Sequence, residues 1–373
     1  MTSIVQVVAD GRPGGGTTAV LTLSRLLAEQ GHEVVVVCQQ DSYLCDEAAK
    51  AGLGVRGIDF SRRLNSLGTA VKLRRHLDQI EPDVVHAHGA RAGLPTVLAA
   101  KWSGARKPRI AYTVHGFHFL AKPAGLFHLA RAAEWMCIAL ADRTNFVSDG
   151  DRRIAREQGL LKHSRGQTTI KNAVEVGDNF EGWPKRHDIA FVGRLAFQKN
   201  PLLLIDILKT LRPLKPTLLV IGGGPLEAEF RARIAQEGLG DQVVLHGECA
   251  RADALRLAAA CRMLLLPSRW EGHPITLIEA AHLGLPVVAS QISGNDEIVK
   301  EGRTGFLVPA SDPAAYARRI AELLADGPLR SRLAEAARVA AARDFSPQRM
   351  VAEHLELYGV ARDPAPPASV VCA

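Results

Sequence analysis

The sequence predicts an α/β protein made of two doubly wound parallel-sheet domains. Short runs of β-branched residues alternate with longer amphipathic stretches along almost the whole chain, and strands that alternate with helices indicate βαβ units. The alternation stops in the polar stretch 174–185, which contains glycine and proline, and then starts again. The 373 residues also exceed what one hydrophobic core usually supports. We therefore expect one domain at 1–180 and a second at 181–345.

The strand pattern recurs at regular places in both halves of the chain, and continuous apolar runs of this length are typical of buried parallel strands. In the first half, strands are expected at 4–8, 33–38, 83–88, 110–115 and 145–148, with helices between them at 17–30, 67–80, 92–102 and 126–141. In the second half, strands are expected at 189–192, 217–221, 243–246, 263–266 and 286–290. The helical segment 346–360 is expected to pack back towards the N-terminal domain, and the tail 361–373 to be disordered.

The composition is that of a soluble globular protein, with 47% hydrophobic and 23% charged residues, and it excludes disordered, collagen-like and coiled-coil chains. The apolar runs are too short for a membrane-spanning helix, and the N-terminus lacks the basic and apolar regions of a secretory signal. The six cysteines form no CxxC pair, so we expect reduced, mostly buried thiols. These observations favour a cytoplasmic protein.

The net charge of +7 favours anionic partners such as nucleotides, phosphorylated lipids or an acidic membrane surface. Basic residues cluster at 62–75 and 101–109. Such a cluster is either an ordinary solvated face or a docking patch for the anionic inner face of the plasma membrane, and both alternatives stay open. Nucleic-acid binding is disfavoured, because aromatic residues make up only 5% and do not interleave with the basic clusters.

Four motifs follow predicted strands, where ligands of parallel sheets bind. The first is the glycine run Gly14, Gly15 and Gly16 before the first helix, which lets the backbone approach a phosphate at the helix N-terminus. A tight structural turn is the plain alternative. A dinucleotide-binding fingerprint is disfavoured, because the second strand ends in Gln39 and not in the acidic residue that would hold a ribose.

The second and third motifs open the second domain. Arg194 follows the strand 189–192 after Gly193, and Lys199 comes five residues later. The pair suits a diphosphate because arginine offers a planar fork and lysine a point charge. Two solvated basic side chains would be the alternative. The third motif, with Gly222 and Gly224 after the next strand, lets the backbone come close to a base or phosphate.

The fourth motif is the most specific and reads PSRWEGHPITLIEA over residues 267–280. A strand ends before it, and a helix begins near Pro274, so Glu271 lies in a turn and Glu279 on the helix. Carboxylates accept hydrogen bonds from vicinal sugar hydroxyls, and the helix N-terminus between them favours an anion. Seven residues lie between the two glutamates, and the first four are Gly272, His273, Pro274 and Ile275. A capped helix with a solvated Glu279 is the alternative, which the apolar neighbours disfavour.

With these motifs the chain resembles family 4 of the retaining glycosyltransferases. The similar segments include FVGRLAFQKNPLLLI, IGGGPLEAEF, LPSRWEGHPITLIEAAHLGLPVVAS and SGNDEIVKEGRTGFLVP. The resemblance implies the GT-B fold, in which two Rossmann-like domains face a central cleft. It also implies that Arg194 and Lys199 bind the donor diphosphate, that Glu279 binds the ribose, and that Glu271 lies beside the donor sugar.

The resemblance extends to the remaining site residues. It implies that the backbone at 272–275 lines the sugar and phosphate, and that the loop 14–16 closes over the diphosphate. His115 matches a histidine near the transferred sugar, so that His115, Glu271, Arg194 and Lys199 are the expected catalytic residues. Two departures from the family pattern, Ala173 after Asn172 and Gly223 in the glycine turn, concern the hinge and the base pocket.

The resemblance implies a retaining hexosyltransferase without a metal or other cofactor. Its donor would be a UDP- or GDP-sugar, and its acceptor a glycan or a polyprenyl- or lipid-linked glycan of cell-surface polysaccharide or lipopolysaccharide. Two alternatives stay open: a GT-B enzyme of nucleotide sugars such as a 2-epimerase, and a nonenzymatic basic protein that binds membranes or nucleic acid. A zinc site at His86 and His88, which share one face of a strand, is disfavoured because the usual ligand spacing is missing.

Overall fold

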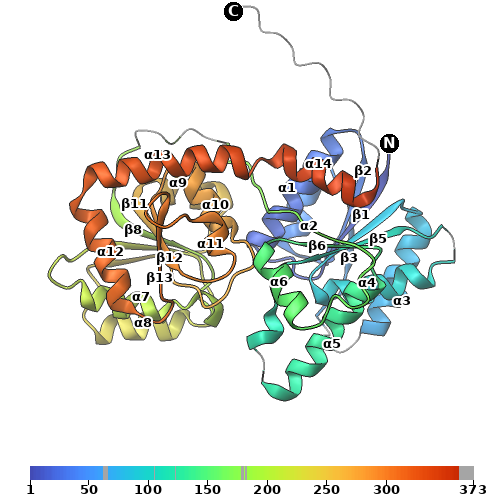
Figure 1. The fold of residues 1–373 in the computed structure, drawn as a ribbon, viewed down its shortest axis with the longest axis horizontal. Coiled ribbons are helices and arrows are strands. Elements are labelled where there is room, and N and C mark those ends of the chain that lie inside the picture. Colours follow the sequence, from blue (N-terminus) through green and yellow to red (C-terminus); the bar gives the residue numbers. More distant parts are fainter. Residues whose placement is uncertain (62–65, 105, 122, 178–179, 181–182, 361–373) are drawn as a thin grey trace, which may run out of the picture. The chain divides into compact units, whose positions relative to one another are not determined.

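The computed structural model describes residues 1–61, 66–104, 106–121, 123–177, 180 and 183–360. The chain divides into two compact units (Figure 1). The first contains Met1–Pro13, Val20–Lys171 and the chain from Pro347 onwards, and the second contains Gly14–Ala19 and Asn172–Ser346. The boundary therefore follows Lys171 instead of residue 180, and the chain after residue 346 groups with the first unit. The tail predicted as disordered, 361–373, lies outside the described residues.

The first unit is built on a parallel seven-stranded sheet with the order β3-β2-β1-β4-β5-β6-β7. In the first six strands this is the doubly wound order, because the chain moves outward from β1 in one direction and then crosses to the other side. The strands are β1 (Ser3–Val8), β2 (Glu33–Gln39), β3 (Gly54–Ile58), β4 (Val84–His88), β5 (Arg109–Val114), β6 (Arg143–Phe146) and β7 (Gln167–Thr169).

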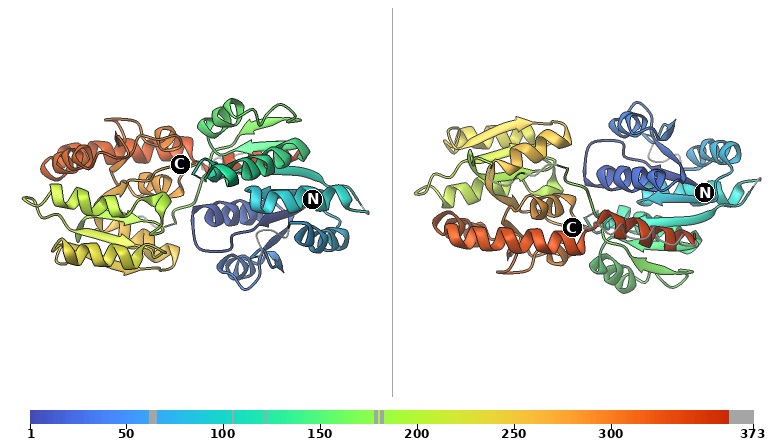
Figure 2. Two further views of the ribbon diagram at one scale, coloured as in Figure 1. Left: turned by 90° about the horizontal axis from the view of Figure 1, so that it is seen from below. Right: turned by 90° about the horizontal axis from the view of Figure 1, so that it is seen from above.

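Helices cover both faces of this sheet (Figures 1 and 2). On one face α4 packs against both α3 and α5. On the opposite face α14 contacts β5 and β6, and its Tyr358 reaches Gln6 and His86. The helices of this unit are α1 (Gly15–Glu29), α2 (Tyr43–Lys50), α3 (Ser66–Ile80), α4 (Ala90–Trp102), the 3-10 turn η1 (His118–Ala121), α5 (Ala124–Leu140), α6 (Asp149–Glu157) and α14 (Pro347–Tyr358). The first residues of α1 belong to the second unit.

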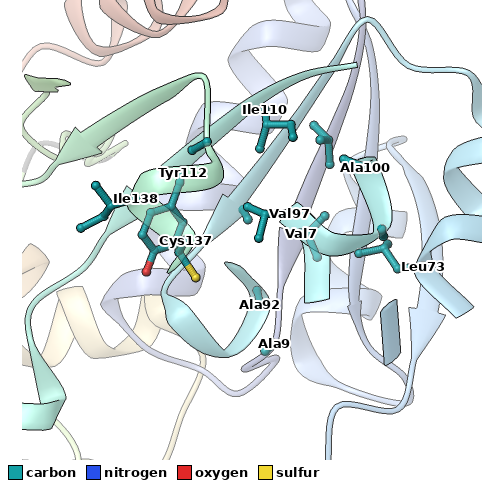
Figure 3. Close-up of a cluster of buried hydrophobic side chains, with 14 of the residues drawn as sticks. Val7, Ala9, Leu73, Ala92, Val97, Ala100, Ile110, Tyr112, Cys137 and Ile138 are labelled. Carbon is teal, nitrogen blue, oxygen red and sulfur yellow. The ribbon is translucent and has the colours of Figure 1, made fainter. Parts of the chain in front are cut away.

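Alternate residues of the central strands face two different environments. Val5 and Val7 of β1, and Val85 and Ala87 of β4, belong to the apolar core beneath α3, α4 and α5. Figure 3 shows part of this core, in which the ring of Tyr112 lies beside Cys137. The alternate residues on the same strands are polar and buried, namely Gln6 of β1 and His86 and His88 of β4. Because strand side chains alternate, the opposite face carries a polar cluster.

The second unit repeats the order, with a parallel six-stranded sheet β10-β9-β8-β11-β12-β13. Its strands are β8 (His187–Val192), β9 (Leu218–Ile221), β10 (Val243–Gly247), β11 (Cys261–Leu266), β12 (Val287–Ser290) and β13 (Gly305–Val308). Its helices are the 3-10 turn η2 (Phe197–Lys199), α7 (Leu202–Thr210), α8 (Glu227–Gln236), α9 (Arg251–Ala259), α10 (Ile275–His282), α11 (Asn295–Ile298), α12 (Pro313–Ala325) and α13 (Gly327–Asp344). Its core lies between the sheet and α7, α8, α12 and the first part of α13.

The structure adds two features that the sequence did not predict. Three edge strands, β3, β7 and β13, were not predicted. The thiols of Cys38, near the end of β2, and Cys45, on α2, have their sulfur atoms 2.9 Å apart. Within the described ranges, no helix combines the length and the apolar content that crossing a membrane requires.

Candidate functional site

The ends of β8 and β9 in the second unit carry two loops whose backbones lie against each other. Leu195 N–H donates to the Gly223 carbonyl (2.8 Å), and Leu226 N–H donates to the Leu195 carbonyl (2.9 Å). Gly222 has φ +130°, and a Cβ there would lie 2.2 Å from the Gly193 oxygen. A Cβ at Gly224 would lie 2.5 Å from the Leu195 oxygen. Both glycines therefore serve this close approach, which does not depend on a ligand.

Lys199 and Glu271 come from different predicted motifs and meet in the second unit. Lys199 Nζ lies 2.6 Å from Glu271 Oε1, and their side chains are only 17% and 7% exposed. Each group neutralises the other, which an ion pair largely removed from water requires. Arg194, by contrast, is exposed where the chain leaves β8. The structure thus brings the ammonium group of Lys199 and the carboxylate of Glu271 together. The guanidinium group of Arg194 belongs to a residue five positions before Lys199 in the sequence.

Several contacts fix the loop of Lys199 against the loop of Glu271. Arg269 N–H donates to the Gln198 carbonyl (2.8 Å), and Gln198 Nε2 donates to the Trp270 carbonyl (3.0 Å). The Arg269 guanidinium donates to Asn200 Oδ1 (2.9 Å) and lies 4.4 Å from the ring centroid of Phe197. These reciprocal bonds hold the Lys199–Glu271 pair in one geometry.

The segment between the two glutamates is buried and leads into α10. Gly272, His273, Pro274 and Ile275 are all buried, and the helix starts at Ile275. The His273 carbonyl accepts a 2.9 Å hydrogen bond from Asn172 Nδ2. The first backbone N–H groups of a helix have no acceptor in the preceding turn, so this helix start offers donors and a positive dipole end.

Glu279 lies on α10 and is 12% exposed. Its Oε1 accepts a 2.7 Å hydrogen bond from Arg251 Nε of α9, and the same guanidinium donates to the Glu175 carbonyl (2.9 Å). Burial raises the pKa of Glu279, and the charge and hydrogen bond of Arg251 oppose that rise. Arg251 was missed by the sequence reasoning, because no local pattern connects a residue on α9 with one on α10.

The glycines at the N-terminal end of α1 belong to the second unit and are exposed. Gly14 precedes the helix, and its carbonyl accepts from Thr17 Oγ1 (2.8 Å). A Cβ at Gly15 would lie 3.3 Å from Ile275 Cβ, the first residue of α10. A Cβ at Gly14 or Gly16 would have no heavy atom within 4 Å. Only Gly15 therefore has a packing reason to lack a side chain.

His115 belongs to the first unit, one residue after β5, and is half-buried. Its Nε2 lies 3.0 Å from Nδ1 of His88. His86 and His88 bind Tyr358, Thr113 and Gln6 through hydrogen bonds. Within the described ranges, no group of three histidine, cysteine, aspartate or glutamate side chains is placed to hold a metal ion.

Comparison with known families gives two matches that together span most of the chain. A family described as "Glycosyltransferase Family 4" matches residues 13–176. A second, described as "Glycosyl transferases group 1", matches residues 178–340.

Two relatives are similar over most of their length. D-inositol 3-phosphate glycosyltransferase of Salinispora arenicola is 34% identical, and the match covers 96% of this chain and 90% of that protein. UDP-Gal:alpha-D-GlcNAc-diphosphoundecaprenol alpha-1,3-galactosyltransferase of Escherichia coli is 27% identical, with 81% and 82% covered.

Among solved structures, the Anabaena protein Alr3699/HepE in complex with UDP and glucose has a TM-score of 0.81 and 19% identity. The match covers 97% of this chain and 100% of that one. This likeness shows the fold. The two doubly wound parallel-sheet domains predicted from the sequence, and their GT-B class, are confirmed.

Proposed function

Because the chain belongs to family 4 of the glycosyltransferases, we propose that it transfers a hexosyl group from a nucleoside-diphosphate sugar to an acceptor hydroxyl with retention of configuration. The acceptor is a glycan or a polyprenyl- or lipid-linked glycan of cell-surface polysaccharide or lipopolysaccharide. The observation that supports the donor site most strongly is the Lys199–Glu271 pair, 2.6 Å apart at the strand ends of the second unit.

The chemistry that this pair serves is the departure of a diphosphate. A leaving diphosphate carries most of the charge that develops in the transition state, so cations and fixed N–H donors directed at it lower the barrier. Lys199 supplies an oriented ammonium group, Arg194 a solvent-exposed guanidinium, and the start of α10 backbone donors. With these groups we propose that diphosphate binding and departure need no metal.

The other polar groups suit the sugar and the ribose. Glu279 offers carboxylate oxygens for the ribose hydroxyls, and Glu271 lies beside the donor sugar. The backbone at 272–275 lines the sugar and phosphate, with contributions from the glycines at 14–16. Gly222 and Gly224 let the loop after β9 lie close to the loop after β8, and the backbone of this loop lines the base or phosphate of the nucleotide. These roles rest on the family resemblance together with the burial of the two glutamates.

The reaction itself is proposed to be an attack by the acceptor hydroxyl from the face that the diphosphate leaves, assisted by the leaving phosphate. No protein nucleophile forms a bond to the anomeric carbon. The resemblance implies that His115 lies near the transferred sugar, where its imidazole binds a sugar hydroxyl.

The donor is proposed to be a UDP-sugar rather than a GDP-sugar. The complex of HepE with UDP and glucose and the name of the Escherichia coli UDP-Gal transferase support this choice. The latter name also supports a diphosphoundecaprenol-linked acceptor. We propose that the enzyme lies in the cytoplasm and contacts the anionic inner face of the plasma membrane through the basic clusters at 62–75 and 101–109, of which residues 62–65 and 105 lie outside the described residues.

The test is calorimetric or thermal-shift binding of UDP, GDP and ADP, each with and without EDTA. A ligand at 100 times its dissociation constant stabilises by about 2.7 kcal/mol, which shifts the melting temperature measurably. We expect UDP to bind and EDTA to have no effect. Losing one hydrogen bond to a charged group costs about 1.5 to 3 kcal/mol, so Arg194→Ala and Lys199→Met should each weaken UDP binding by about 10- to 100-fold.

A matched control is Lys209→Met. Lys209 forms a lysine–glutamate pair with Glu237, 2.8 Å apart in the same unit and at the opposite end of α7 from Lys199, and its loss should leave UDP binding unchanged. Product analysis with UDP-sugars, with and without lipid-linked acceptor, then tests transfer. Binding of no nucleotide, or epimerised sugar with donor alone, would contradict the proposed function.

A further inference from the structure

A continuous chain of buried hydrogen bonds runs from the last helix of the first unit to His115. Tyr358 of α14 has its hydroxyl 2.7 Å from His86 Nδ1 and 3.1 Å from Gln6 Nε2. Gln6 Oε1 lies 2.8 Å from His88 Nε2, and His88 Nδ1 lies 3.0 Å from His115 Nε2. The chain therefore joins residues that are more than 240 positions apart in sequence.

The donors and acceptors along this chain have one consistent direction. Gln6 Nε2 is an amide nitrogen and donates to the Tyr358 hydroxyl, so Gln6 Oε1 faces His88 as an acceptor. His88 Nε2 must then carry the hydrogen. A neutral imidazole has one N–H, so His88 Nδ1 is an acceptor, and the hydrogen between the two rings belongs to His115 Nε2.

The other branch agrees with this direction. The Tyr358 hydroxyl accepts from Gln6 and donates its own hydrogen to His86 Nδ1, so His86 carries its hydrogen on Nε2. That N–H donates to Thr113 Oγ1, 2.7 Å away. Asn145 completes the chain: its Oδ1 accepts from the Ile170 N–H, so its Nδ2 donates to Thr113 Oγ1.

The burial of these rings keeps them neutral, as the assignment requires. Desolvation lowers the pKa of His86 and His88 well below the usual range, and it lowers the pKa of His354 to about 4. The other titratable group from α14 that faces the rings is Tyr358, whose pKa is raised by burial. Neutral imidazoles have fixed donor and acceptor nitrogens, whereas a charged ring would have two donors and would break the direction.

We propose that Tyr358, Gln6 and His88 are positioning residues that hold His115 in the tautomer with its hydrogen on Nε2, directed at His88 Nδ1. In this tautomer Nδ1 of His115 carries no hydrogen, and the proposed function assigns it the hydrogen bond from a sugar hydroxyl. The relation to substrate rests on the proposed function, whereas the tautomer is a property of the protein without ligand.

The reversed chain is the specific competitor. If the Gln6 amide turned by 180°, its nitrogen would donate to His88 Nε2, and every hydrogen between Tyr358 and His115 would move to the other partner. His115 would then carry its hydrogen on Nδ1. The two states differ in a quantity that can be measured, because the two tautomers place the pyrrole-type and pyridine-type nitrogens at opposite positions of the ring.

The experiment is a long-range ¹H–¹⁵N correlation spectrum of the full chain with ¹⁵N-labelled histidine, with the His115 signals assigned by their loss in His115→Gln. We expect a single tautomer with a pyrrole-type Nε2 and a pyridine-type Nδ1. Tyr358→Phe removes the hydroxyl that orients Gln6, so the His115 signals should show loss of the single tautomer. A pyrrole-type Nδ1 in the wild type overturns the proposal whether or not the variant folds.

The matched control is Tyr316→Phe, which removes a buried hydroxyl of the second unit that lies 2.8 Å from Ser290 Oγ. It should leave the His115 signals unchanged. An unchanged spectrum in folded Tyr358→Phe would also overturn the proposal. In transfer assays Tyr358→Phe should lower kcat with little change in KM for the donor. Failure of the proposed function would show as absent nucleotide binding, and the tautomer would still be read from the same spectra.

Discussion

Glu134 on α5 provides a test of how burial governs this fold. Its carboxyl group is buried in the first unit and binds the Tyr112 hydroxyl at 2.7 Å, on the core face shown in Figure 3. Burial raises the pKa of Glu134 from 4.5 to about 7, and the hydrogen bond from Tyr112 opposes this only in part. At neutral pH the folded protein therefore either binds a proton here or holds a charge away from water.

The sign and size of the effect follow from linkage. Because the folded-state pKa is higher than the unfolded one, the folded state binds the proton more tightly, and this stabilisation is full below about pH 4.5 and lost as the pH rises to about 7. The difference of about 2.5 between the two pKa values corresponds to about 3 kcal/mol. About 2 kcal/mol of this loss falls between pH of about 5.5 and about 8.

The perturbation is Glu134→Gln, which keeps the shape and cannot ionise. We expect the variant to gain about 2 kcal/mol relative to the wild type between the lower and the higher pH. Hydrogen exchange of the α5 peptides, corrected for the intrinsic effect of pH, measures this free energy of local opening. Glu157→Gln, an exposed carboxylate of the same unit, is the control and should show no such gain. An equal difference between variant and wild type at both pH values would refute the reasoning.

Two further predictions concern the second unit. Glu279→Gln should weaken UDP binding about tenfold, because a neutral amide is a poorer acceptor for ribose hydroxyls than a carboxylate. Calorimetry compares it with Glu322→Gln, which changes an exposed side chain of α12 and should bind like the wild type. Gly222→Ala places a Cβ 2.2 Å from the Gly193 oxygen and should destabilise the protein by about 1 to 3 kcal/mol. Thermal unfolding measures this. Gly240→Ala, where a Cβ meets nothing within 4 Å, serves as its control, and equal melting temperatures for the two variants would contradict the packing argument.

The central strands could be predicted from sequence because burial on both faces leaves a continuous apolar run, as in β1 and β2. Two of the edge strands that were not predicted, β3 and β7, carry no such signal. Four of the five residues of β3 (Gly54–Ile58) are exposed or half-buried, and β7 has three half-buried residues. They are strands because their backbone groups form hydrogen bonds with the neighbouring strands, β2 and β6. The domain boundary was placed near residue 180 because composition changes there, whereas packing sets it after Lys171.

The candidate site was predictable where it is local in sequence. Glu271 and Glu279 share one strand–turn–helix segment, so their spacing indicated that both serve one site. The partners from other elements were not predictable. Arg251 reaches Glu279 from α9, and Tyr358 reaches His86 from the last helix, and neither distance is encoded in a local pattern. A zinc site at His86 and His88 was weighed in the sequence analysis, although disfavoured. Two histidines on one strand face suggest metal ligands as long as the side chains that accept and donate their hydrogen bonds are unknown.

The grouping of α14 with the first unit has a consequence for how the protein is made. The sheet of that unit is complete in the growing polypeptide once β7 has been synthesised, but α14 follows roughly 190 residues later, a delay of about 10 to 40 seconds at usual translation rates. During this time the polar face with Gln6 and His86 has no Tyr358 against it. The first domain therefore cannot bury this polar face beneath α14 until the second domain has been synthesised.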